Sequence, residues 1–279
     1  MKILCLDGGG VFGFAQARIL DEAKCSDKFD AFVGTSIGSA VAAAHALGVG
    51  EKVNQDFFDE WMPQIFKKPS VLRRMNPFAS KYPDEKLIEA LQYVFRSSNM
   101  GDVKRPLFVT AVNVSAKRLK VFDSFNVDDS SLPLWKVIRS ATAAETYFRP
   151  FSGVADGGIL ANNPSLVAIA SAVVEFKAKV EDIEILSIGT GDGARGNGTP
   201  RTKIGWGLWL IGALLDGASD GMNDYYVRAL AKGGAIKRYE RIQFPSELHW
   251  EMDSVESMRD AERAWEPDIR KAIQTVRDF

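Results

Sequence analysis

One stretch of the sequence carries the clearest fold signal: residues 29–47 read FDAFVGTSIGSAVAAAHAL. An apolar run occupies residues 29–33, the pattern G-x-S-x-G follows at residues 34–38, and an alanine-rich segment continues to the end of the stretch. This order predicts a buried strand, a tight turn and a helix. Such a turn holds its serine in a strained, exposed conformation, and the helix N-terminus behind it favours developing negative charge. We therefore expect Ser36 to be a nucleophile.

A glycine-rich loop precedes this stretch. Residues 2–6 read as a short apolar strand, and residues 7–13 read DGGGVFG before a helical segment at residues 14–23. The backbone N–H groups of a loop between a strand and a helix can converge on an anion. One such use is an oxyanion hole, formed by the N–H groups of Gly8, Gly9, Gly10 and Ile37.

A dinucleotide site is the alternative use of the same loop. Gly8, Gly10 and Gly13 also fit the pattern G-x-G-x-x-G between a strand and a helix. Such a site needs an acidic residue at the end of the second strand to bind ribose. Here that end is residues 33–36, and Asp30 stands at the start of the strand. We therefore favour the oxyanion hole over the nucleotide site.

The wider pattern predicts a single α/β domain over residues 1–279. A strand–helix–strand opening favours a mostly parallel central sheet covered by helices, with the nucleophile turn after the second strand. The glycine-rich residues 192–203 are the best loop or lid-hinge candidate. Further strands are expected at residues 107–114, 119–122, 183–188 and 236–244, and helices at 56–66, 84–95, 134–143, 167–180, 207–231 and from about 255.

Composition narrows the functional classes. With 35 basic and 36 acidic residues the net charge is −1, so nothing global attracts nucleic acid or an anionic membrane. Cys5 and Cys25 form neither a disulfide framework nor a metal-site spacing, and we expect no metal or cofactor. The N-terminal apolar run is too short for a signal peptide, and the uncharged residues 204–215 are too few to span a bilayer. These features favour a cytoplasmic location, with any lipid contact made by a local patch.

The base that would activate Ser36 is less obvious. His45 lies nine residues after Ser36 on the same expected helix. That spacing is roughly 13 Å along the axis at ~1.5 Å per residue, so His45 cannot reach. His249 leaves a Ser36–Asp156–His249 triad open, although α/β-hydrolases reach their nucleophile after several strands. Asp156, followed by two glycines, indicates by itself only a turn before a helix.

Taken together, these motifs resemble the patatin-like phospholipase family. Residues 7–13, 34–38 and 156–158 occur in the family's order, and the likeness covers residues 1–191, leaving 192–279 without a familial motif. Residues 139–148, 162–164 and 187–191 also look familial. The resemblance implies a patatin-like three-layer fold and a Ser36–Asp156 dyad without histidine, supported by Gly13, Gly34, Gly38, Gly157 and Gly158.

The resemblance also implies an activity: hydrolysis of phospholipids or other acyl lipids through an acyl-enzyme, as by a phospholipase A or a lysophospholipase. Bacterial relatives of this kind include effectors that cyclic nucleotides switch on to degrade their own membrane, although no nucleotide site is evident in this sequence. A carboxylate with an ordinary pKa near ~4 is a poor base for an alcohol, so burial should raise the pKa of Asp156. A binding protein that kept the fold but lost activity is the alternative, and intact Ser36 and Asp156 argue against it.

Two residues depart from the family pattern. Phe12 stands where Arg or Lys is common, which removes a cation that could contact phosphate. Glu145 stands where a proline is usual. The first departure bears on headgroup preference, and neither removes the dyad.

Two segments are candidates for peripheral contact with the inner face of a membrane. Residues 206–215, with two tryptophans, are either a core helix or a lid or interfacial helix. Residues 67–78 mix basic and apolar side chains, as either a solvated loop or a contact for anionic lipid.

Overall fold

A mostly parallel sheet forms the centre of the protein. The computed structural model describes residues 1–70, 73, 75–76, 78–191, 200–247 and 249–279. In this part of the chain the strand order is β4-β3-β2-β1-β6-β7, and the short β5 pairs with β3 beyond the end of β2. Only β4 and β5 run antiparallel to their neighbour. The strands are β1 (Lys2–Leu6), β2 (Ala31–Thr35), β3 (Leu107–Asn113), β4 (Arg118–Asp123), β5 (Val154–Asp156), β6 (Glu184–Ile188) and β7 (Arg238–Ile242).

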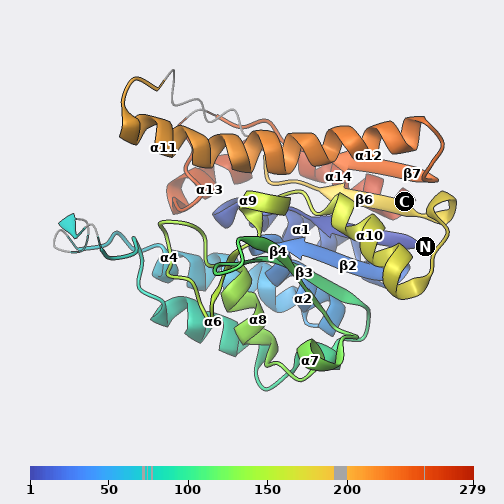
Figure 1. The fold of residues 1–279 in the computed structure, drawn as a ribbon, viewed down its shortest axis with the longest axis horizontal. Coiled ribbons are helices and arrows are strands. Elements are labelled where there is room, and N and C mark those ends of the chain that lie inside the picture. The colour runs from blue at the N-terminus through green and yellow to red at the C-terminus, as the bar shows by residue number, and fades with distance from the viewer. Residues whose placement is uncertain (71–72, 74, 77, 192–199, 248) are drawn as a thin grey trace.

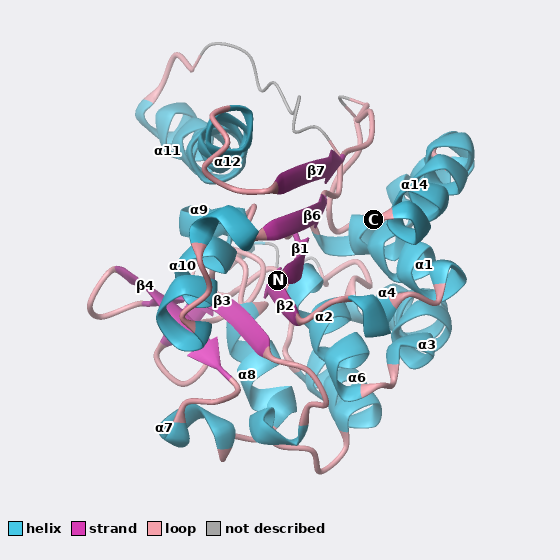
Figure 2. Cartoon of the chain, turned by 90° about the vertical axis from the view of Figure 1, so that its right-hand side faces the viewer, coloured by secondary structure: helices cyan, strands magenta, loops and turns pink. Residues whose placement is uncertain are grey.

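Helices cover both faces of this sheet, which makes the three layers visible in Figures 1 and 2. Alternate side chains of β1 point to opposite faces, as the twofold period of a strand requires. Ile3 and Cys5 pack with α10 (Ser165–Phe176) and α12 (Met222–Lys232). Leu4 and Leu6 lie in the larger core, with α1 (Phe14–Ala23), α2 (Ile37–Leu47) and α14 (Glu266–Asp278).

The remaining helices follow the expected order along the chain. The turn that carries Ser36 lies between β2 and α2, so the predicted strand–turn–helix is confirmed. Residues 107–114 and 119–122 form the β3–β4 hairpin. The other helices are α3 (Gly50–Lys52), α4 (Met62–Ile65), α6 (Glu85–Phe95), α7 (Val127–Ser130), α8 (Leu134–Ala141), α9 (Gly158–Ala161), α11 (Lys203–Gly212) and α13 (Val255–Ala264).

Three differences from the sequence-based expectation affect the site. The helix expected at residues 56–66 begins as the π-helical segment Val53–Trp61. The segment before Asp156 is a strand, β5, because it pairs with the far half of β3. A second π-helical segment, Ala213–Gly221, joins α11 to α12.

The interpretation of residues 206–215 as a core helix is wrong for the side chains that the structure describes. Trp206, Trp209, Leu210 and Leu214 are all exposed. The lid-hinge candidate at 192–203 lies outside the described residues over 192–199, and Thr202 caps α11 by accepting a hydrogen bond from Gly205 N.

Candidate active site

Ser36 occupies the sharp turn between β2 and α2. Its φ of 51° and ψ of −127° place it outside the conformations that a non-glycine residue ordinarily adopts. A backbone of this kind costs on the order of 1–3 kcal/mol and persists only where the surroundings enforce it. Ser39 supports the turn, since its N–H donates to the Ser36 carbonyl at 2.9 Å. Ser36 thus has the strained geometry that the G-x-S-x-G pattern predicts.

Glycines let this turn approach the rest of the sheet. A side chain at position 34 would place its Cβ 2.5 Å from the Ser39 Cα. One at position 38 would lie 2.5 Å from the Asp7 carbonyl oxygen, and one at position 8 would lie 3.1 Å from the Ser36 Cβ. The glycine-rich loop and the serine turn are therefore in direct contact.

The predicted oxyanion donors differ in what they already bind. Gly8 N–H donates to the Asn162 carbonyl at 3.3 Å. The N–H groups of Gly9, Gly10 and Ile37 have no hydrogen-bond acceptor within the described ranges. Gly10 has a φ of 60°, and a side chain there would collide with the Met252 carbonyl. Three of the four predicted donors are thus unengaged beside Ser36.

Asp156 ends β5 and is 3 % exposed. Its Oδ1 accepts a hydrogen bond from Gly158 N at 2.8 Å, and its backbone N–H donates to the Ala143 carbonyl. The Thr110 hydroxyl on β3, the strand that pairs with β5, lies 2.6 Å from the Thr35 hydroxyl at the end of β2. Because β3 pairs with both β2 and β5, it places Asp156 close to the turn that carries Ser36.

The Asp156 carboxyl has a strongly perturbed acidity. Its pKa is raised from 3.8 to about 7, first by burial and then by the negative charge of the neighbouring Glu145, and hydrogen bonding by the Ser36 hydroxyl and the Gly158 N–H offsets part of this rise. The Asp156 Oδ2 makes no hydrogen bond of ordinary geometry in the described part of the chain. Contacts of this kind are commonly loose before substrate binds. The structure thus brings Ser36 and Asp156 together, with a carboxyl whose pKa suits a base near neutral pH.

The two histidines lie elsewhere. His45 bonds the Ser26 hydroxyl at 2.8 Å through Nδ1, and burial lowers its pKa to about 4. His249 packs against the Trp250 ring. Neither histidine lines the pocket that contains Ser36, and within the described residues neither bonds Ser36 or Asp156.

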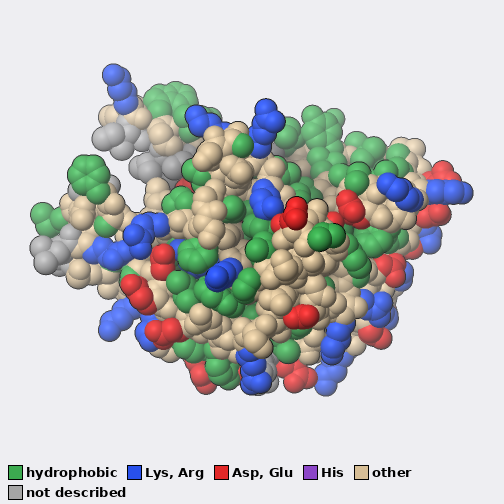
Figure 3. Space-filling view, turned by 60° about the horizontal axis from the view of Figure 1, so that its bottom comes forward, with side chains coloured by type: hydrophobic (Ala, Val, Ile, Leu, Met, Phe, Trp, Pro, Cys, Tyr) green, Lys and Arg blue, Asp and Glu red, His purple; other side chains and the backbone are tan. Residues whose placement is uncertain are grey.

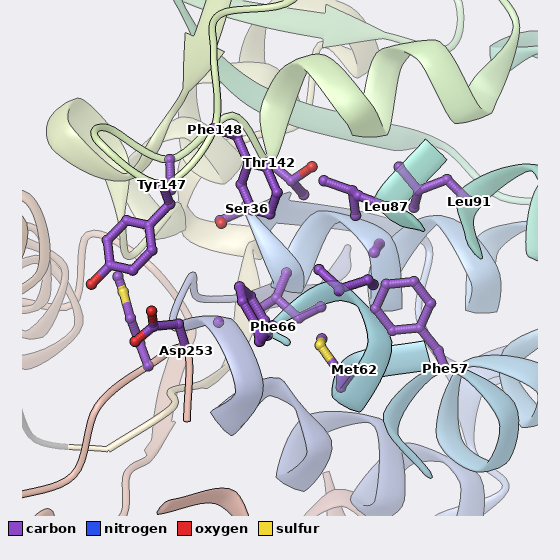
Figure 4. Close-up of a pocket in the computed structure, with 16 residues that line it drawn as sticks. Ser36, Phe57, Met62, Phe66, Leu87, Leu91, Thr142, Tyr147, Phe148 and Asp253 are labelled. Carbon is purple, nitrogen blue, oxygen red and sulfur yellow. The ribbon is translucent and has the colours of Figure 1, made fainter. Parts of the chain in front are cut away.

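A narrow apolar pocket opens at Ser36 (Figure 4). The space that the centre of a water molecule can reach in it is only about 50 Å³. Figure 4 shows Ser36 between two ends, with Tyr147 and Asp253 at one and Phe57, Leu87 and Leu91 at the other. Met62, Ile65, Phe66 and Phe148 are among the remaining apolar walls. A slot of this shape fits an alkyl chain better than a polar group.

The sequence missed a buried ion-pair network behind the glycine loop. Arg241 on β7 bonds Asp7 Oδ2 at 2.6 Å and Asp220 Oδ1 at 2.9 Å, and it also bonds the Ser187 hydroxyl. Asp7 precedes the three glycines, so Arg241 ties the loop to the C-terminal third of the chain. An isolated arginine in a strand gave no signal, because its partners lie more than twenty residues away in sequence.

Ser219 is a second missed residue. Its hydroxyl donates to the Gly158 carbonyl and accepts from Asn162 N, and its carbonyl accepts from Asn163 N at 3.3 Å. It thereby fixes both ends of α9, directly after Asp156. No sequence motif distinguishes it from other serines.

Phe12, the departure in the glycine loop, is a core residue. It is 2 % exposed, and its ring lies 6.0 Å from that of Trp250 and 5.7 Å from that of Trp265. We expect Phe12→Arg to lower the free energy of unfolding by about 3 kcal/mol or more, because it buries a charge among aromatic rings. Urea unfolding measures this, with Phe12→Leu as the milder control. Unchanged stability in Phe12→Arg would contradict the packing role.

Among the residues that are described, no group of His, Cys, Asp and Glu side chains is arranged to hold a metal ion. None of the described helices combines the length and the apolar character needed to cross a membrane.

Comparison with known proteins identifies the family. A family model described as patatin-like phospholipase matches residues 4–169. The cGAMP-activated phospholipase of Vibrio cholerae is 29% identical over 258 residues, which cover 77% of this chain and 72% of that protein. The cGAMP-activated phospholipase of Pseudomonas aeruginosa is 32% identical, with 77% and 69% covered, and Protein teg of Priestia megaterium is 31% identical, with 74% and 68% covered. The crystal structure of VipD from Legionella pneumophila aligns with 98% of this chain and 66% of its own, at 13% identity and a TM-score of 0.49. The chain belongs to the patatin-like phospholipase family.

Proposed function

We propose that the protein is a serine lipid acyl hydrolase that uses a Ser36–Asp156 dyad. One observation carries this proposal: a strained Ser36 lies beside a buried Asp156 with a pKa of about 7, at the opening of a narrow apolar pocket. A perturbed carboxyl beside a nucleophile in a pocket is typical of a catalytic site.

The proposed reaction proceeds through an acyl-enzyme. Ser36 Oγ attacks the ester carbonyl while Asp156 accepts the hydroxyl proton, and that proton then passes to the leaving alkoxide. The N–H groups of Gly9, Gly10 and Ile37 stabilise the oxyanion, and Gly8 N–H joins them only by giving up its bond to Asn162. Water, deprotonated by Asp156, then attacks the acyl carbon and releases the fatty acid and Ser36.

The substrate class follows from the pocket and from the family. An acyl chain fits the apolar slot lined by Phe57, Leu87 and Leu91, with its ester at Ser36. Phospholipids or lysophospholipids are the proposed substrates, since the named relatives are phospholipases. The test is to incubate the protein with phospholipid vesicles and to identify the products by mass spectrometry. Free fatty acid with lysophospholipid or a glycerophosphodiester is expected, and intact lipid under all conditions would count against the proposal.

Pocket length gives a prediction about chain preference. Leu91→Phe should lower kcat/KM for a decanoyl ester about tenfold relative to a butyryl ester, because a larger side chain fills the end of the slot away from Ser36. Comparison of p-nitrophenyl butyrate with p-nitrophenyl decanoate measures it. Tyr93→Phe, on the exposed side of the same helix, is the control and should leave the ratio unchanged. Equal losses on both esters in Leu91→Phe would mean that the slot does not hold the chain.

The same assays distinguish the dyad from two alternatives. In a Ser36–Asp156–His249 triad, His249→Ala would abolish turnover, whereas the dyad predicts normal turnover. A catalytically idle binding protein would turn over no ester and would not react with a fluorophosphonate probe.

A small-molecule activator is a further part of the proposal. Relatives carry the names cGAMP-activated and cUMP-AMP-activated phospholipase, which makes a cyclic dinucleotide the first activator class to test. The measurement is phospholipid turnover with and without cGAMP and cUMP-AMP. A rise of turnover with either nucleotide supports activation, and equal turnover in both conditions contradicts activation by these two.

A further inference from the structure

We infer that two apolar projections at the carboxyl end of the sheet form one surface that docks on anionic lipid. The first consists of the described residues between 66 and 80, namely 66–70, 73, 75–76 and 78–80, and the second is α11 with the residues on either side of it, 200–214. We call Met75, Phe78, Trp206, Trp209 and Leu210 together the docking surface. The inference rests on the proposed function, because a lipid hydrolase must meet its substrate at a lipid layer.

The side chains of the docking surface are unusually exposed for their type. Phe78 is 95 % exposed, Met75 75 % and Trp206 50 %. Trp206, Trp209 and Leu210 follow the spacing i, i+3, i+4 and therefore share one face of α11. Gathered apolar side chains on a surface mark an interaction site, and tryptophan favours the boundary between water and lipid.

Hydrogen bonds link several of the described residues of the first projection. Arg73 Nε donates to the Ser80 carbonyl at 2.9 Å and Arg73 Nη2 donates to the Tyr82 carbonyl at 3.1 Å. Phe78 N–H donates to Asn76 Oδ1 at 2.9 Å. These bonds join described residues of the first projection to one another and to Tyr82, and the Phe78 ring, 95 % exposed, lies outside the core. The Phe78 ring is thus free to contact a surface that approaches the protein.

The positive charge of the two projections favours an anionic partner. Residues 66–80 and 200–215 contain six Lys or Arg residues and no Asp or Glu, although the whole chain has 35 basic and 36 acidic residues. Figure 3 shows Lys and Arg side chains beside the hydrophobic ones at this end of the molecule. Basic side chains around apolar ones match the headgroups and acyl chains of an anionic lipid layer. A second copy of the chain would oppose like charges across a twofold axis.

The first projection begins at the candidate active site, and the segment that follows α11 contacts the element next to Asp156. Phe66 lines the Ser36 pocket, and the first projection continues from it. At the other side Thr190 contacts Gly9, and Ser219, shortly after α11, binds both ends of α9. Figure 1 places α11 and the described residues between 66 and 80 at the same end of the long axis, opposite the N-terminus from which β1 starts. A lipid layer on the docking surface would therefore lie at the opening of the pocket.

Vesicle binding tests the docking surface without turnover. Every variant is made in a Ser36→Ala background and sedimented with phosphatidylcholine vesicles that contain or lack phosphatidylglycerol. Met75→Ser/Phe78→Ser and Trp206→Ser/Trp209→Ser should each reduce partition onto the phosphatidylglycerol vesicles at least about tenfold, because exposed apolar side chains supply the insertion. Lys67→Glu/Lys203→Glu should remove the preference for phosphatidylglycerol.

The matched control is Phe125→Ser. Phe125 is also exposed, but it follows β4. It therefore lies near the start of β3, away from the carboxyl end of the sheet where the docking surface lies. It should bind vesicles like the parent, and circular dichroism melts show whether each variant is folded. Equal binding by all folded variants would overturn the inference. So would dissociation of a dimer by the same substitutions, seen by sedimentation equilibrium, with vesicle binding intact.

Activity separates this inference from the proposed function. In the active protein the docking substitutions should lower hydrolysis of vesicle phospholipid and leave hydrolysis of soluble p-nitrophenyl butyrate unchanged. Loss of activity on both substrates in a folded docking variant would contradict a role limited to docking. If the unsubstituted protein cleaves no ester at all, the proposed function fails, whereas the vesicle-binding result still decides the docking surface.

Discussion

Replacement of Ser36 by alanine is expected to lower the turnover of acyl esters by about 10³-fold or more, as loss of a catalytic nucleophile does in other hydrolases. The reason is local. Three hydroxyls line the pocket among the described residues, those of Ser36, Thr142 and Tyr147, and the Ser36 hydroxyl is the one next to the unengaged N–H group of Ile37. Without Oγ no acyl-enzyme can form, although the oxyanion donors remain. Turnover of p-nitrophenyl butyrate and labelling by a fluorophosphonate probe measure the effect.

The control for this prediction is Ser26→Ala. Ser26 has a histidine beside its hydroxyl, which lies 2.8 Å from His45 Nδ1. It lies at the far end of α2 from Ser36, and its substitution should leave turnover and labelling unchanged. Persistent labelling of Ser36→Ala, or loss of labelling in Ser26→Ala, would place the nucleophile elsewhere.

The parts of the site that are local in sequence were predictable from sequence. Ser36 and its glycines lie within one strand–turn–helix, so the apolar pattern and the glycine spacing predict both the elements and the close approach. The same holds for the glycine loop after β1. In each case the residues that constrain the backbone are neighbours in the chain.

The parts that depend on distant residues were not predictable. Arg241 on β7 bonds Asp7 across β6, because β6 is the single strand between β1 and β7 in the sheet. This sheet order is set by packing and not by any local sequence pattern. In the sequence Phe12 is only a departure from the family pattern in the glycine loop. Its role in the core depends on contacts with Trp250 and Trp265, which are distant in the chain. The strand character of β5 depends on its pairing with β3, as the cross-strand register shows.

Asp156→Asn is the second large expected effect, a loss of turnover of about 10³–10⁴-fold, because an amide cannot accept the Ser36 proton. The same carboxyl sets the pH dependence. Only the ionised form is a base, and burial raises the pKa of Asp156 to about 7, so kcat/KM should rise with pH and level off above that value. His249→Ala should behave like the unsubstituted protein, and its inactivity would favour the triad.

Stability measurements separate a catalytic loss from a folding defect. Because the pKa of Asp156 is raised on folding, its favourable contribution is complete below its unfolded value of 3.8 and is lost as the pH rises through about 7. Asp156→Asn lacks this loss. Its melting temperature relative to that of the unsubstituted protein should therefore increase from pH 5 to pH 8, and a difference that stays constant or falls over this range would contradict a buried carboxyl with a raised pKa.

Substitution of Glu145 tests whether Asp156 sets the pH profile of kcat/KM. The negative charge of Glu145 is the second cause of the raised pKa of Asp156, after burial. In Glu145→Gln the charge is removed while the shape is kept, so the pKa of Asp156 should fall and the pH profile of kcat/KM should move to lower pH. The gain in activity over the unsubstituted protein should then be largest below pH 7 and vanish above it. Glu181→Gln, an exposed residue before β6, should leave the profile in place. An unmoved profile in Glu145→Gln would mean that the titrating base is not Asp156, whereas a profile that moves only with Glu145 ties the pH dependence of turnover to this one buried carboxyl.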